Sequence, residues 1–141
     1  MSASKNRLTN MLYTTYNGNG GGGLVSICIE LYSKENGDCP VAEFISSLDK
    51  KMAAKVLRTI DLLEEYGNDL RPPYSKTISN GIFELRTKQG SDITRVFYFF
   101  FVDNKAIITN GFVKKTQKTL PREIELATKY KADYERRYKH G

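Results

Sequence analysis

The sequence predicts an α+β domain with a small, antiparallel-rich β-sheet, two helices in its first half and one at its C-terminal end. Three observations predict this class. Two early segments place apolar residues at helical spacing, and three segments rich in β-branched and aromatic residues follow with short turns between them. A third helical segment closes the chain. The expected order is β-α-α-β-β-β-α, and 141 residues fit one domain.

The first 23 residues differ in composition from the rest of the chain. They end in a glycine-rich run, Asn17–Gly23, which has the composition of a flexible linker. A phosphate-binding glycine loop is a poor match, because no strand precedes the run and no Lys-Ser/Thr pair follows it. We expect residues 1–23 to be a flexible extension, disordered or not native to the fold, and residues 24–141 to form the domain.

The first strand and the first helix are predicted from Leu24 to Leu48. The β-rich run Leu24–Tyr32 predicts a strand, and Asn36-Gly37 is a strong turn signal. Pro40 then suits the first position of a helix, where its missing N–H costs nothing. One face of this helix carries the apolar residues Val41, Phe44, Ile45 and Leu48.

A second helix is predicted to begin after Asp49, whose carboxylate can cap the free backbone N–H groups. Its apolar residues recur at helical spacing and predict core packing. Gly67 and Asn68 end it. The buried stripe consists of Met52, Val56, Ile60 and Leu63, broadened by Ala53 and Leu57.

The sheet is predicted in the second half of the chain. Arg71–Tyr74 is expected to be an extended connection, since residues before proline avoid the helical region. Three strands follow, and their short connections favour antiparallel pairing. Within the second, Val96–Val102 is continuously apolar, as for a central strand that is covered on both faces. The strands are Ile82–Lys88, Ile93–Val102 and Lys105–Val113.

The last helix is predicted to open at Thr119-Leu-Pro121 and to run to about Lys139. Three tyrosines recur along it at spacings of four, which places them on one face. Docking of the helix on the sheet is the better interpretation of this stripe than stacking with nucleic-acid bases. The tyrosines are Tyr130, Tyr134 and Tyr138.

Positive charge is concentrated in the segment that holds the predicted strands. The chain has a formal charge of +6, and residues 71–118 carry nine Lys and Arg against three acids. The charges of the flanking regions, −2 over residues 1–70 and +2 over residues 119–141, cancel one another. A basic patch on rigid strands favours a polyanion as ligand, and a pI of about 9.3 favours nucleic acid or an acidic protein.

Several kinds of site are disfavoured by composition. His140, next to the C-terminus, is the single histidine, so a Ser-His-Asp or Cys-His site is implausible. Cys28 and Cys39 lack partners at metal spacing and form no disulfide framework. Asp92 and Asp103 look like turn residues, which disfavours a two-metal nuclease. We therefore expect no metal and no cofactor. No apolar run approaches the length that spans a membrane, and the expected location is cytoplasmic.

Lys and Arg remain as candidates for the site. Glu84, Arg86 and Lys88 alternate along one strand and share a face. Arg95 lies in an otherwise apolar run, where a charge is costly unless it is paired or lies at a groove. It is either a structural partner of Glu84 or a phosphate clamp, with the clamp slightly favoured.

A second group of cations, Lys114, Lys115 and Lys118, lies where the last strand runs into the loop before the final helix. A solvated run of charge is one interpretation of this group. The other is an anion site, because the N–H groups at the start of a helix also favour anions.

Cleavage of RNA by transesterification needs only cations from the protein, because RNA supplies its own nucleophile, the 2′-OH. Guanidinium groups bind phosphate oxygens bidentately and stay charged. A lysine among other cations has a lowered pKa and can serve as a weak general base. Electrostatic stabilisation of the phosphate would carry much of the barrier reduction.

Three segments of the sequence resemble the phage Gp49-like branch of the RelE/ParE toxin superfamily, which contains HigB-type toxins. The similarity covers roughly Leu24 to Tyr138, and the predicted order of elements agrees with the RelE-like fold. Leu120 stands where the family usually has proline. The segments are Gly81–Arg86, Arg95–Tyr98 and, the most specific, Asn110–Thr119, with Pro121 and Ala127 after it.

The resemblance implies the toxin of a type II toxin-antitoxin system, a metal-independent, ribosome-dependent mRNA endonuclease that stops translation. Its implied partners are mRNA on the ribosome and a cognate antitoxin, with a helix-turn-helix, whose complex with the toxin binds operator DNA. No membrane is implied. By position, the catalytic residues are Arg86, Arg95, Lys114 and Lys115, and Lys118 supports RNA binding. Lys76 and Lys88 are expected to bind RNA through their charge.

Two other functions stay open at this stage. A ParE-like inhibitor of DNA gyrase would share the fold without being a nuclease, although the Lys-Lys-Thr-Gln-Lys segment at residues 114–118 favours the nuclease branch. A non-catalytic RNA-binding module would bind RNA with strong salt dependence and leave it intact.

Overall fold

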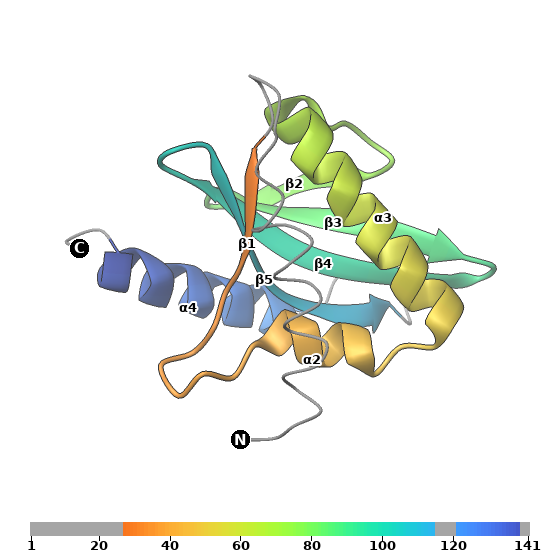
Figure 1. Ribbon diagram of the computed structural model, residues 1–141, viewed down its shortest axis with the longest axis horizontal. Coiled ribbons are helices and arrows are strands. Elements are labelled where there is room, and N and C mark those ends of the chain that lie inside the picture. Colours follow the sequence, from red (N-terminus) through yellow and green to blue (C-terminus); the bar gives the residue numbers. More distant parts are fainter. Residues whose placement is uncertain (1–26, 115–120, 139–141) are drawn as a thin grey trace.

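A computed structural model describes residues 27–114 and 121–138 of the chain (Figure 1). They form a five-stranded mixed sheet with helices on both faces, which confirms the predicted α+β class. The described elements are β1 (Cys28–Leu31), α2 (Pro40–Ser46), α3 (Lys50–Tyr66), a 3₁₀ turn (Gly67–Asp69), β2 (Ser75–Ser79), β3 (Ile82–Gln89), β4 (Asp92–Phe101), β5 (Lys105–Lys114) and α4 (Pro121–Tyr138).

The strands lie in the order β1-β5-β4-β3-β2. The four strands from β2 to β5 pair antiparallel, and β1 joins β5 in parallel at the other edge. The hairpin turn between β4 and β5 is made by Asp103 and Asn104, with φ of 65° and 55°. Both residue types tolerate this left-handed conformation, which confirms the predicted turn.

Strand β2 was not predicted, and the order of elements is therefore β-α-α-β-β-β-β-α. The segment Arg71–Tyr74 is also a turn and not an extended connection. The N–H groups of Tyr74 and Ser75 both donate to the carbonyl of Arg71, at 3.0 and 3.2 Å, and this turn leads directly into β2. A hairpin turn at Asn80-Gly81, with φ of 52° and 79°, then joins β2 to β3.

Helices α2 and α3 begin where the sequence predicts. Pro40 occupies the first turn of α2. The carboxylate of Asp49 accepts a hydrogen bond from the backbone N–H of Met52 at 2.8 Å, which satisfies one of the free donors at the start of α3. The predicted stripe of α3 is buried in the main core, and the helix ends at Gly67 with φ of 52°.

The sheet has a separate core on each face. Val96 and Tyr98 of β4 point toward α2 and α3, which Figure 1 shows in front of the sheet. Phe97 and Phe99 alternate with them and pack on the side of α4. Strand β4 is thus a central strand covered on both faces, as predicted. The turn residue Val102, at the end of the apolar run, is exposed.

Helix α4 docks on the sheet mainly through Tyr134, which is buried against Phe99 and Phe101. Tyr130 stacks on Tyr32 with ring centroids 4.7 Å apart. Tyr138 is half exposed, so the predicted stripe docks through two of its three members.

Cys28 is an exposed free thiol and Cys39 a buried one. Within residues 27–114 and 121–138, no helix is long and apolar enough to cross a lipid bilayer. The expectation for residues 1–23 falls outside the described residues.

Candidate functional site

Four cations and one carboxylate are brought to the α4 face of the sheet by strand register. Arg86 of β3 lies directly opposite Arg95 of β4, and Lys76 of β2 lies opposite Glu84 of β3. Residues opposite each other in antiparallel strands share a face. Lys114 is paired with Ile93, two residues from Arg95 along β4, and so joins the same face. Lys76, Arg86, Arg95 and Lys114 are called the cationic cluster below.

Arg95 and Glu84 form an ion pair at the base of this cluster. Only 3% of Arg95 and none of Glu84 is exposed to solvent. Burial lowers the pKa of Arg95, but a guanidinium stays charged at any physiological pH. The structure thus shows Arg95 as the structural partner of Glu84. The phosphate clamp, which the sequence slightly favours, is not the arrangement seen, because the guanidinium is engaged by Glu84 and shielded from solvent.

The other three cations of the cluster act electrostatically on Lys114. The pKa of Lys114 is lowered from its ordinary 10.5, first by burial and then by the positive charges of Arg95, Arg86 and Lys76. Like charges disfavour the ammonium form, so Lys114 gives up its proton more readily than an isolated lysine. This is the property that a general base of the lysine type needs.

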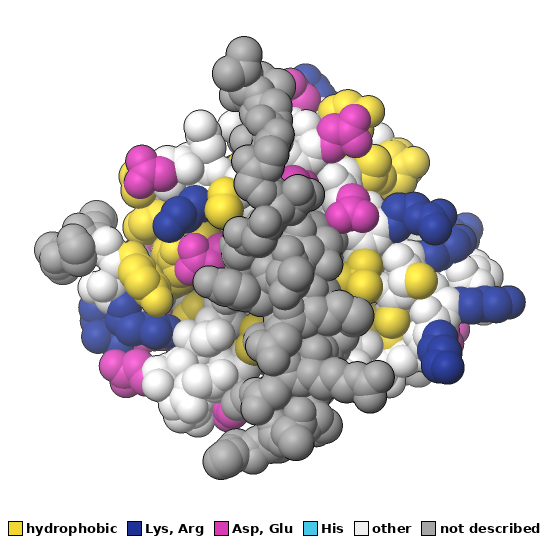
Figure 2. Space-filling view, in the orientation of Figure 1, with side chains coloured by type: hydrophobic (Ala, Val, Ile, Leu, Met, Phe, Trp, Pro, Cys, Tyr) yellow, Lys and Arg dark blue, Asp and Glu magenta, His cyan; other side chains and the backbone are white. Residues whose placement is uncertain are grey.

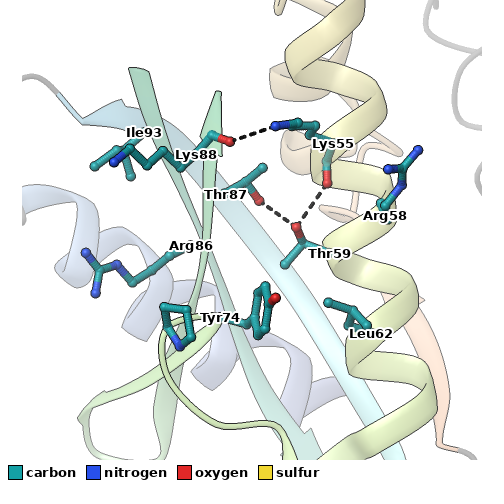
Figure 3. Close-up of a pocket in the computed structure, with 10 residues that line it drawn as sticks. Lys55, Arg58, Thr59, Leu62, Tyr74, Arg86, Thr87, Lys88 and Ile93 are labelled. Carbon is teal, nitrogen blue, oxygen red and sulfur yellow. Dashed lines mark hydrogen bonds between the residues drawn. The ribbon is translucent and has the colours of Figure 1, made fainter. Parts of the chain in front are cut away.

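Arg86 is the accessible guanidinium of the cluster. It is partly exposed, and Figure 3 shows it pointing away from α3. Its backbone is held by the hydrogen bond from its N–H to the carbonyl of Tyr74, at 2.8 Å. The neighbouring Lys76 and Lys88 are exposed on β2 and β3. These three side chains can contact a polyanion without rearrangement of the core.

Gly111 and Asn110 fix the strand that carries Lys114. A Cβ at Gly111 would lie 2.7 Å from a ring atom of Phe44 and 3.0 Å from the carbonyl oxygen of Arg95, so only glycine fits without a shift. The buried amide of Asn110 donates to the carbonyl of Glu123 in the first turn of α4, at 3.5 Å. Both residues belong to Asn110–Thr119, the segment that is most specific for the family resemblance.

The predicted site residues fall into two groups. Arg86, Arg95 and Lys114 come together with Lys76, as described, and Lys88 lies on the same strand face as Arg86. Lys115 and Lys118 lie outside the described residues. In the described ranges, no three Cys, His, Asp or Glu residues are grouped so as to hold a metal ion.

Sequence analysis missed a group of residues on the opposite side of β3. Lys55, Arg58 and Tyr74 line a pocket between α3 and the end of β3. The available signal was weak: Lys55 and Arg58 lie one helical turn apart on α3, away from its buried stripe.

Residues 43–132 match the model of one protein family, described as phage-derived protein Gp49-like (DUF891). This span runs from α2 into α4 and includes the whole cationic cluster. The chain belongs to the Gp49-like family. No curated protein matches it.

The Gp49-like family lies in the RelE/ParE-like branch of toxins, which confirms the resemblance seen in the sequence. A small α+β fold with a mixed sheet agrees with that assignment. Membership places this chain among phage-derived, toxin-like proteins.

Proposed function

We propose that this Gp49-like protein is the toxin of a type II toxin-antitoxin system and cleaves mRNA on the ribosome. The observation that carries the proposal is the cationic cluster. It joins an accessible guanidinium, Arg86, to a lysine of lowered pKa, Lys114, on one rigid sheet face. A phosphodiester with a neighbouring 2′-OH is a substrate for which these groups suffice.

In the proposed reaction the 2′-oxygen of the RNA attacks the adjacent phosphorus. The bond from phosphorus to the 2′-oxygen forms while the bond to the 5′-oxygen breaks, which leaves a cyclic phosphate and a free 5′-OH. The 2′-OH proton passes to a base, for which neutral Lys114 is the candidate, and the departing 5′-oxygen takes up a proton from water. Arg86 neutralises the charge that builds on the phosphate oxygens.

The remaining cations support this site. Arg95 acts through its charge on Lys114 and through its pairing with Glu84, which ties β3 to β4 beneath Arg86. Lys76 and Lys88 would hold the RNA backbone on either side. Lys115 would add a further cationic group to the catalytic site, and Lys118 would help to bind RNA.

The ribosome would supply the alignment of the mRNA, which is the proximity contribution to the rate. Cleavage of free RNA by the isolated protein is then expected to be slow. In the cell the toxin would be neutralised by an antitoxin with a helix-turn-helix, and their complex would bind operator DNA.

The test is the integrity of a defined mRNA in a translating extract that receives the purified protein. Cleavage by the wild type and its loss in Arg86→Ala support the proposal. Arg136→Ala is the matched control. Arg136 is 63% exposed in the last turn of α4, and its replacement by alanine removes the same charge as Arg86→Ala does. Intact mRNA together with loss of DNA supercoiling by gyrase would identify the ParE-like activity instead. Intact mRNA that still binds the protein would indicate a non-catalytic RNA-binding module.

A further inference from the structure

A pocket of about 370 Å³ lies on the α3 side of β3, across the strand from the cationic cluster (Figure 3). Helix α3 forms one wall, and the turn before β2 together with the end of β3 forms the other. Its lining is Lys55, Arg58, Thr59, Leu62, Pro73, Tyr74, Arg86, Thr87, Lys88 and Ile93.

The rim of this pocket is cationic. Lys55 and Arg58 reach it from α3, whereas the side chains of Arg86 and Lys88 leave β3 toward the opposite face, and none of its described lining residues is an acid. Figure 2 shows Lys and Arg side chains gathered over α3 and the neighbouring end of the sheet. The ammonium of Lys55 donates to the carbonyl of Lys88 at 3.4 Å, which links the two walls. The charge favours an anionic ligand.

The interior is suited to a flat ring. The hydroxyl of Thr87 donates to that of Thr59, which donates in turn to the carbonyl of Lys55, each at 3.0 Å. Both hydroxyl protons of the floor are therefore engaged within the protein. Leu62 and Pro73 supply an apolar wall, and Tyr74 is 45% exposed. An exposed aromatic ring beside cations is the arrangement that stacks a nucleobase.

The pocket is also continuous with the cationic cluster. Arg86 belongs to both: it lines the pocket, and its guanidinium points away from α3. The pairing of β2 with β3 ends at Ser75 and Leu85, and Arg86 makes one further hydrogen bond to Tyr74, so the residues of β3 from Thr87 onward form an open edge of the sheet. A nucleic-acid strand can cross this edge from one face to the other.

We propose that the pocket holds one nucleobase of the RNA whose neighbouring phosphate lies at the cationic cluster. Tyr74 stacks on the base, and Arg58 and Lys88 contact the backbone that leads to it. This inference rests on the proposed action on RNA and adds a subsite to it. An acidic peptide would match the charge, but it would make no use of the exposed ring next to a phosphate site.

The experiment measures binding of a short single-stranded RNA with 2′-O-methyl riboses, which cannot be cleaved, by fluorescence anisotropy. Tyr74→Ala should weaken binding about fivefold to a hundredfold, the range for loss of one base stack. Tyr74→Phe should bind as the wild type does. Tyr66→Ala is the matched control, because Tyr66 is also half exposed but does not line the pocket.

A strand of the same length without bases separates stacking from charge. Its binding should be unaffected by Tyr74→Ala and weakened by Arg58→Ala. Equal weakening of both strands by Tyr74→Ala, or no weakening of either, would overturn the proposal. The proposal would also be overturned if Tyr74→Ala weakened the binding of polyglutamate but not the binding of RNA. Absence of the proposed nuclease activity is detected in a separate experiment, as intact mRNA in the translating extract.

Discussion

Arg86 and Arg95 lie directly opposite each other on β3 and β4, but their surroundings differ. Arg95 is buried and paired with Glu84, whereas Arg86 is partly exposed and its guanidinium points away from α3. Two arginines on the same face of the sheet therefore have different roles. Arg95 links β3 to β4 through its ion pair and contributes positive charge, and Arg86 can contact a ligand.

Loss of one partner of the buried pair should destabilise the fold strongly. Arg95→Ala or Glu84→Ala removes one member of this buried ion pair, and we expect a decrease of about 3–5 kcal/mol in the free energy of unfolding. Urea unfolding followed by circular dichroism measures it. The double replacement Glu84→Leu/Arg95→Met should lose far less than either single change. A single variant as stable as the wild type would show that the pair does not hold the strands.

The pKa of Lys114 should rise when a neighbouring charge is removed. It is lowered by burial and by Arg95, Arg86 and Lys76, so Arg86→Ala should move it back toward 10.5. Titration of the lysine side-chain signals by NMR measures this shift. Arg136→Ala, in the last turn of α4, should leave the pKa of Lys114 unchanged. An equal response to both variants would mean that Arg86 does not act on Lys114.

Stability at low pH should depend on Asp133. Hydrogen bonds from Tyr32 and Arg137 lower the pKa of this carboxyl from 3.8 to about 2. As the pH falls, the carboxyl of Asp133 is therefore protonated in the unfolded chain before it is protonated in the folded protein. The stabilisation that ionised Asp133 gives the fold is complete above about pH 4 and is lost as the pH falls toward 2. The stability difference between wild type and Asp133→Asn should shrink over this range in urea unfolding. A difference that is constant with pH would contradict the assignment.

Gly111→Ala should destabilise the protein by about 1–3 kcal/mol, the usual cost of overpacking. The new methyl group would crowd the ring of Phe44 and the carbonyl oxygen of Arg95. The thermal unfolding midpoint measures the effect. Because the ring is the closer obstacle, Phe44→Ala combined with Gly111→Ala should cost less than the sum of the two single changes. Strict additivity would show that the two positions do not crowd each other.

Much of the fold follows from local signals in the sequence. The Asp49 cap, the stripe of α3 and the Asp103-Asn104 turn are each specified within a few residues, and all three are seen. Strand β2 was missed because Ser75–Ser79 contains one apolar residue and is mostly exposed. The hairpin signal was nevertheless present at Asn80-Gly81.

The site was predictable only in part. Alternation along β3 correctly places Glu84, Arg86 and Lys88 on one face. The sequence offered the pairing of Arg95 with Glu84 as one of two alternatives, and the choice between them depends on the register that sets Glu84 diagonally across from Arg95. The pocket beside Tyr74 depends on how α3 packs on β3, a long-range contact that no local pattern specifies.

The most direct test of the central claim is to map mRNA 5′ ends in cells after induction of the protein. We predict new 5′ ends within translated reading frames when the wild type or Arg136→Ala is expressed, and none with Arg86→Ala at the same protein level. Stopped growth without new 5′ ends, or the same ends from Arg86→Ala, would contradict an mRNA endonuclease that uses the cationic cluster.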